Sequence, residues 1–154
     1  MAKTELVATD GHKLGAYRAD PSARPKGAVV VVQEIFGVNE HIRSICDRLA
    51  SEGYVAIAPA LFDLTERGFE CGYSPDEVAR ARAFIADADW DAFVRDTEAA
   101  RAAVADIGKV GVIGLCMGGT VAFLAATRLQ GFSAASGFYG GKIHSFADEQ
   151  PKCA

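Results

Sequence analysis

A cysteine flanked by glycines is the feature of this sequence that most clearly points to chemistry. The stretch Gly114-Leu-Cys-Met-Gly118 follows an apolar run, 110–113, and precedes the helix-forming segment 120–126. A strand, a tight turn and a helix with a nucleophile at the apex make up a nucleophile elbow, usually G-x-S-x-G and here with a thiol. Glycines suit the strained backbone of such a turn. We expect the helix N-terminus behind Cys116 to lower the pKa of the thiol and to offer an oxyanion site.

Two further apolar runs, 28–32 and 54–58, predict strands that are buried on both faces, as in a parallel sheet covered by helices. Between them, Asn39 is the expected N-cap of an amphipathic helix. The apolar face of that helix is Ile42, Ile45, Cys46 and Leu49. Residues 28–59 therefore predict a strand–helix–strand unit with a right-handed crossover.

The remaining patterns complete an α/β chain. Segments 4–9 and 13–17 around Asp10-Gly11 predict a hairpin, and 132–138 predicts a further strand. A capping box at 74–77 and the cap Asp89 predict two helices, the second with an apolar face of Phe93, Val94, Thr97, Ala100 and Val104. This order indicates a doubly wound, mostly parallel sheet, in which Glu34, the loop after Pro59 and Cys116 converge at the carboxyl edge.

Composition excludes several classes of function. The 154 residues carry a formal net charge of −4, which gives no footprint for nucleic acid or an anionic membrane. No apolar run approaches the length of a membrane span, and the N-terminus has no signal-peptide core, so the cytoplasm is the default location. The four cysteines lack metal-binding or disulfide spacing, so neither a zinc site nor a disulfide framework is indicated. We expect no metal and no cofactor.

Two motifs together resemble the dienelactone hydrolase family, the carboxymethylenebutenolidases of the α/β-hydrolase superfamily. They are Gln33-Glu-Ile-Phe-Gly-Val-Asn39 and Gly114-Leu-Cys-Met-Gly-Gly119, supported by shorter matches at 41–43, 47–50, 53–56 and 58–59. The resemblance runs from about residue 5 to the last residue. It implies one α/β-hydrolase domain over 1–154, incomplete at its C-terminal side, that acts on a small lactone or ester.

The resemblance also implies roles for individual residues. Cys116 matches the nucleophile, and Glu34 matches a glutamate that assists its activation. The backbone amides of Ile35 and Met117 match the oxyanion hole. The family's arginine for a substrate carboxylate lies in the segment that holds Arg80 and Arg82, although the spacing does not match cleanly.

The family's acid and histidine have no counterpart in this sequence. Both follow the nucleophile in α/β-hydrolases, whereas His12, His41 and His144 match no catalytic position. We therefore expect a fragment that covers about the first two-thirds of a family member. Such a chain alone would be inactive or would stall as an acyl-enzyme.

Two other readings compete with catalysis. A truncated chain would expose the edge of strand 132–138 and an apolar helix face, which favours self-association. Alternatively, Cys116 would act as a redox-sensing thiol, a reading that a pKa above about 8.5 would weaken. Of the other cysteines, Cys46 is expected to pack in the core, and Cys71 and Cys153 to be exposed. Tyr73 and Trp90 are expected to be packing residues.

Overall fold

The computed structural model describes residues 2–86 and 88–154, which alternate between strands and helices. The strands are β1 (Ala2–Val7), β2 (Lys13–Ala19), β3 (Ala28–Val32), β4 (Val55–Pro59), β5 (Val110–Leu115) and β6 (Phe132–Phe138). The helices are α1 (Glu40–Ser51), α2 (Pro75–Ala86), α3 (Trp90–Ala102) and α4 (Met117–Arg128). Short 3-10 turns lie at Leu61–Leu64, Ala105–Ile107 and Ile143–Phe146. None of the helices described is long and apolar enough to cross a membrane.

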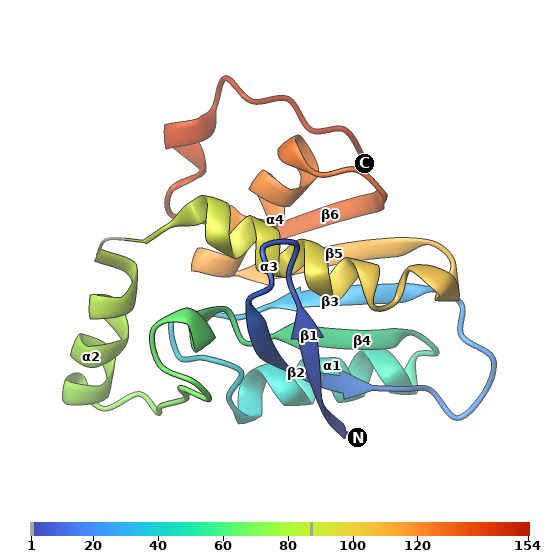
Figure 1. The fold of residues 1–154 in the computed structure, drawn as a ribbon, viewed down its shortest axis with the longest axis horizontal. Coiled ribbons are helices and arrows are strands. Elements are labelled where there is room, and N and C mark those ends of the chain that lie inside the picture. Colours follow the sequence, from blue (N-terminus) through green and yellow to red (C-terminus); the bar gives the residue numbers. More distant parts are fainter. Residues whose placement is uncertain (1, 87) are drawn as a thin grey trace.

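The strands form one mixed sheet in the order β1-β2-β4-β3-β5-β6 (Figure 1). The hairpin β1–β2 is antiparallel and joins the sheet through an antiparallel pairing of β2 with β4. The pairs β3–β4, β3–β5 and β5–β6 are parallel. The predicted hairpin and the mostly parallel α/β sheet are therefore confirmed. The strand predicted at 54–58 runs one residue later, with Pro59 as its last residue.

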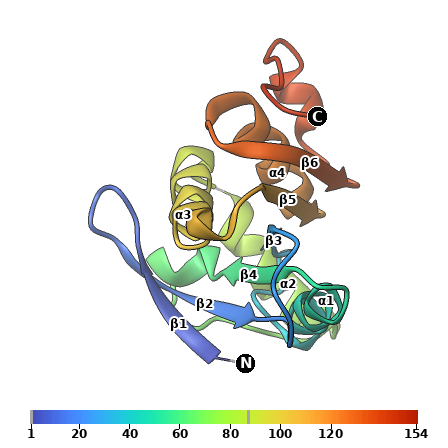
Figure 2. The same ribbon diagram turned by 90° about the vertical axis from the view of Figure 1, so that its right-hand side faces the viewer.

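Strand β3 is buried on both sides because helices cover both faces of the sheet. Val30 and Val32 belong to the core under α3 and α4, whereas Val31 packs with Ile42 and Cys46 of α1. Figure 2 shows α3 and α4 on one side of the sheet and α1 on the other. The alternation follows from strand geometry, which points successive side chains to opposite faces.

The predicted helix caps are present. The side chain of Asn39 accepts a hydrogen bond from the Ile42 amide, and that of Asp89 accepts one from the Ala92 amide. At the start of α2, the Glu77 carboxylate accepts hydrogen bonds from the backbone and hydroxyl of Ser74. These contacts satisfy amide groups that have no partner within their own helix.

The C-terminal segment corrects one expectation. The Lys152 amide donates to the carbonyl of Ala126, and Glu149 accepts from Thr127 and Arg128. The segment therefore packs on α4, whose apolar side chains are largely buried rather than exposed. The contacts of this segment are made by backbone groups and a few charged side chains, which its sequence pattern does not reveal.

The edge strand β6 remains largely open, as expected. Residues 133, 134 and 136–138 are exposed, although the amide of Ala135 donates to the carbonyl of Ala154. Beside β6, a hollow of about 430 Å³ lies between α1 and the uncovered face of β5. Its apolar lining is Ile45, Leu49, Ile113, Leu115 and Phe138.

Candidate active site

Cys116 sits at the apex between β5 and α4, as the elbow motif predicts. Its backbone has φ 55° and ψ −122°, a left-handed conformation that is strained for any residue with a side chain. The Cys116 amide donates to the carbonyl of Phe138 at 3.0 Å, and its own carbonyl accepts from the Gly119 amide at 2.9 Å. The thiol is half-buried. Strand β6 and helix α4 thus hold the strained turn in place.

The glycines of the motif are required by close backbone approach. A Cβ at Gly114 would overlap the carbonyl of Gly118, and a Cβ at Gly118 would overlap the carbonyls of Val32 and Gln33. Every atom in these collisions belongs to the backbone, so none can rotate away. The close approach brings the elbow directly against the end of β3.

The pKa of the Cys116 thiol is shifted in the direction opposite to the one we expected. Burial raises the pKa of Cys116 above its usual value, and the neighbouring Glu34 carboxylate raises it further. The Met117 amide at the helix N-terminus lowers the pKa of the thiol, but this single donor does not outweigh burial. The prediction of a lowered pKa is therefore wrong, and the redox-sensor reading loses its support. A protonated thiol needs a base before it can attack.

The end of β3 brings a carboxylate, Glu34, close to the elbow. Gln33 is fully buried, and its side chain accepts from the Leu61 amide at 3.1 Å and donates to the backbone carbonyl of Glu34 at 3.2 Å. Gln33 thereby fixes the backbone that carries Glu34. The Glu34 carboxylate accepts a hydrogen bond from the Tyr139 hydroxyl at 3.0 Å. Ile35 and Met117, the two expected amide donors, are both buried.

Of the two aromatic residues that were expected to pack, Tyr73 lies on the surface and Trp90 packs. Tyr73 is 61% exposed, lies edge-on against Phe36 with ring centroids 4.7 Å apart, and its hydroxyl accepts a hydrogen bond from Asn39. It is not the packing residue that we expected. Trp90 does pack, against Phe93 and Phe146.

Tyr139, which no sequence motif indicated, lies next to both Glu34 and Cys116. Burial and the Glu34 carboxylate raise the pKa of Tyr139 to about 12, with smaller contributions from Cys116 and Tyr73. A signal was available, because Tyr139 directly follows a strand predicted to end at the carboxyl edge.

The two arginines of the expected substrate site lie on α2. Arg80 forms an ion pair with Glu66 at 2.6 Å and lies over the ring of Phe69. Arg82 is exposed on the same helix. Their proposed contact with a substrate carboxylate stays a prediction.

The histidines lie apart from the elbow. His12 faces Asp96 at 3.7 Å, His41 is exposed on α1, and His144 is exposed in a 3-10 turn. Over residues 2–86 and 88–154, no histidine forms a hydrogen bond with Cys116 or Glu34. The same ranges contain no group of three His, Cys, Asp or Glu side chains that could hold a metal ion.

The other three cysteines are all at least partly buried. Cys46 is fully buried, as predicted. Cys71 and Cys153, expected to be exposed, are partly buried and pack against the main core. Within the described residues, none of the four cysteines forms a disulfide.

Comparison with known proteins identifies relatives of this chain. A provisionally named carboxymethylenebutenolidase of Synechocystis is 39% identical over 94% of this chain and 62% of that protein. The carboxymethylenebutenolidase of Pseudomonas putida is 38% identical over 85% of this chain and 57% of that protein. The chain thus spans about 60% of the length of these two relatives.

A comparison with solved structures leads to the same group of proteins. The crystal structure of a provisionally named dienelactone hydrolase from Klebsiella pneumoniae matches with a TM-score of 0.76 and 32% identity, over 90% of this chain and 59% of that one. The sequence model of the dienelactone hydrolase family matches residues 14–154. Both the elbow and the motif around Glu34 fall within this range. The chain therefore belongs to the dienelactone hydrolase family, whose members have the α/β-hydrolase fold.

Proposed function

We propose that Cys116 is the nucleophile of a site that opens a small lactone or ester. The observation that carries this proposal is the strained Cys116 at the carboxyl edge of the sheet, with a carboxylate beside it. Relatives named carboxymethylenebutenolidase and dienelactone hydrolase support the substrate class.

The first step follows from the protonated state of the thiol. Glu34 takes the proton of the Cys116 thiol as the sulfur attacks the carbonyl carbon. The negative charge that develops on the carbonyl oxygen is held by the amides of Ile35 and Met117. The ester C–O bond then breaks, the leaving oxygen takes the proton from Glu34, and a thioester remains on Cys116.

The second step is hydrolysis of the thioester by water, which needs a base oriented for that task. No histidine of the described residues lies at the elbow, so we expect the 154-residue chain to acylate once and to turn over slowly. Losing triad members in other hydrolases lowers the rate by orders of magnitude.

Release of p-nitrophenol from p-nitrophenyl acetate tests this function. We expect a burst stoichiometric with the protein, absent in Cys116→Ala and slowed in Glu34→Gln. Cys153→Ser is the matched control, because it removes another partly buried thiol and leaves the elbow intact. A burst of equal size in Cys116→Ala would contradict the proposal.

The open β6 edge favours a second candidate, self-association without catalysis. The strand is exposed at residues 133, 134 and 136–138, and the apolar hollow beside it adds contact area. Light scattering across a concentration series tests this candidate. A monodisperse monomer at all concentrations would count against it.

A further inference from the structure

Tyr139 is strained in the same way as Cys116. Among the residues described, these two alone combine a side chain with a positive φ, which is 42° at Tyr139 and 55° at Cys116. Such a backbone conformation costs free energy and persists only where the surroundings impose it. Glycine would remove the cost, as it does in six other described turns of this chain. The presence of tyrosine therefore calls for a role of its side chain.

The two strained residues are held together by their strands. Leu115 of β5 pairs with Phe138 of β6, so Cys116 and Tyr139 follow a matched pair of residues. The Cys116 amide donates to the carbonyl of Phe138 at 3.0 Å. Gly119 at the start of α4 packs against this same carbonyl and against Gly140. The turn at Tyr139 is thus built into the elbow.

The side chain of Tyr139 is not there to be buried. It is 63% exposed, yet its hydroxyl reaches across to Glu34, a residue 105 positions away, and donates to Oε1 at 3.0 Å. Its pKa of about 12 keeps this hydroxyl protonated, and therefore a donor, throughout the neutral range. No second hydrogen bond to the Glu34 carboxylate is found in the ranges 2–86 and 88–154.

We propose that Tyr139 is a positioning residue, whose hydroxyl holds the Glu34 carboxylate against the Cys116 thiol. Gln33 fixes the backbone of Glu34, and Tyr139 fixes its carboxylate. The strain at the end of β6 is retained because this backbone directs the phenol toward β3. The inference rests on the proposed function only in taking Cys116 and Glu34 as the reacting pair.

The molecule contains a matched control. Tyr17 donates to the carboxylate of Asp47 at 2.8 Å, and burial and Asp47 raise the pKa of Tyr17 to about 12. This phenol–carboxylate pair joins β2 to α1. Tyr17→Phe therefore removes the same kind of hydrogen bond at a place that the proposal does not involve.

The test is the pH dependence of Cys116 alkylation by iodoacetamide, resolved by peptide mass spectrometry because the chain has four cysteines. Glu34→Gln removes a charge that opposes the thiolate, so the midpoint should fall by about half a pH unit. Tyr139→Phe should move the midpoint the same way, because an untethered carboxylate turns into solvent. Tyr139→Phe should add nothing in the Glu34→Gln background, and Tyr17→Phe should match the wild type.

Three outcomes would overturn the proposal. Tyr139→Phe could leave the midpoint unchanged while Glu34→Gln shifts it, or it could shift the midpoint equally in both backgrounds. Alternatively, Glu34→Gln could have no effect. A merely structural role of Tyr139 would lower the melting temperature and leave the midpoint in place. Alkylation needs no ester, so the inference and the proposed function can fail independently.

Discussion

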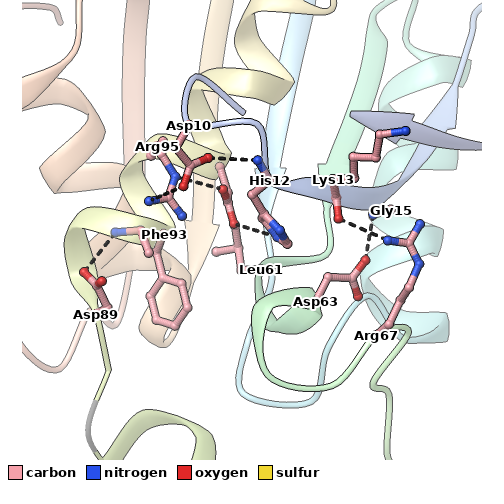
Figure 3. Close-up of polar contacts among 12 residues, drawn as sticks. Asp10, His12, Lys13, Gly15, Leu61, Asp63, Arg67, Asp89, Phe93 and Arg95 are labelled. Atoms are coloured by element: carbon pink, nitrogen blue, oxygen red, sulfur yellow. Dashed lines mark hydrogen bonds and ion pairs between the residues drawn. The ribbon is translucent and has the colours of Figure 1, made fainter. Parts of the chain in front are cut away.

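Two polar clusters of this protein differ in backbone strain, which is present at the candidate active site and absent from the other cluster. The first joins Glu34, Cys116 and Tyr139 at the carboxyl edge, where two residues are strained and the tyrosine is exposed. The second lies between the β1–β2 hairpin and α3, and Figure 3 shows Asp10, His12 and Arg95 from it. Its backbone contains no strained residue of this kind.

The hairpin–α3 cluster contains a carboxylate whose pKa is strongly raised. Asp96 is fully buried, with Arg95 Nε at 3.5 Å and His12 Nε2 at 3.7 Å, and burial raises its pKa to about 6. Neither of its carboxylate oxygens has a hydrogen-bond partner in the part of the chain that the structure describes. A perturbed pKa alone would place a candidate site here. The strained backbone at the half-buried Cys116 thiol favours the elbow instead as the candidate site.

The largest expected loss of stability comes from a substitution in the strained turn itself. Gly114→Ala forces a Cβ into the carbonyl of Gly118 and should destabilise the fold by about 3 kcal/mol or more. Gly111→Ala on the same strand is the control, because its Cβ would meet only the carbonyl of Ala134 at an ordinary 3.6 Å. Urea unfolding compares the two variants. Equal losses of stability would show that close approach at the elbow is unimportant.

The next effect concerns the buried Asp96. Its pKa in the folded state lies above the ordinary value of 3.8, so the neutral form is favoured by folding. Its contribution to stability is complete below pH 4 and is lost as the pH rises through about 6. Asp96→Asn mimics the neutral form and should therefore be more stable than the wild type at pH 7.5, by on the order of 2 kcal/mol.

Urea unfolding at pH 4 and pH 7.5 measures this difference. The difference in the free energy of unfolding between Asp96→Asn and the wild type should be small at pH 4 and increase toward pH 7.5. The pH midpoint of Cys116 alkylation should not move, which would sharpen the separation of the two clusters. A gap that is independent of pH would contradict the assignment to Asp96.

The smallest effect compares two helix caps. Asn39→Ala and Asp89→Ala each remove an acceptor for a helix amide, and each should cost about 1 kcal/mol. Asn39 also donates to Tyr73 at the active-site edge, whereas Asp89 begins α3. Fluorescence quenching of a Trp90→Phe protein, whose emission then comes from tyrosine, should change with Asn39→Ala and not with Asp89→Ala. Identical quenching of both would place Tyr73 outside the influence of Asn39.

Local patterns predicted most of the fold. The runs at β3 and β5, the caps Asn39 and Asp89, and the glycines around Cys116 each carry their structural meaning within a few residues. The proximity of Glu34 to Cys116 was also predictable, because both follow strands that end at one edge of the sheet.

Long-range contacts explain what the sequence did not predict. The pKa of Cys116 depends on its burial and on Glu34, which short-range reasoning about a helix N-terminus does not include. Tyr139 was missed because its hydroxyl contacts a residue 105 positions away. Asp96 lies on the buried side of α3, yet its neighbours come from the hairpin, so its sequence context gave no sign of its burial.

The most direct test of the central claim is to locate the acyl group after reaction with an activated ester. Peptide mass spectrometry at neutral pH should find one acyl group on Cys116, held as a thioester that hydroxylamine removes. Its formation should be slower in Glu34→Gln, because the thiol then lacks its base. Acylation of Cys71 or Cys153 at the same rate, or none at Cys116, would contradict the account.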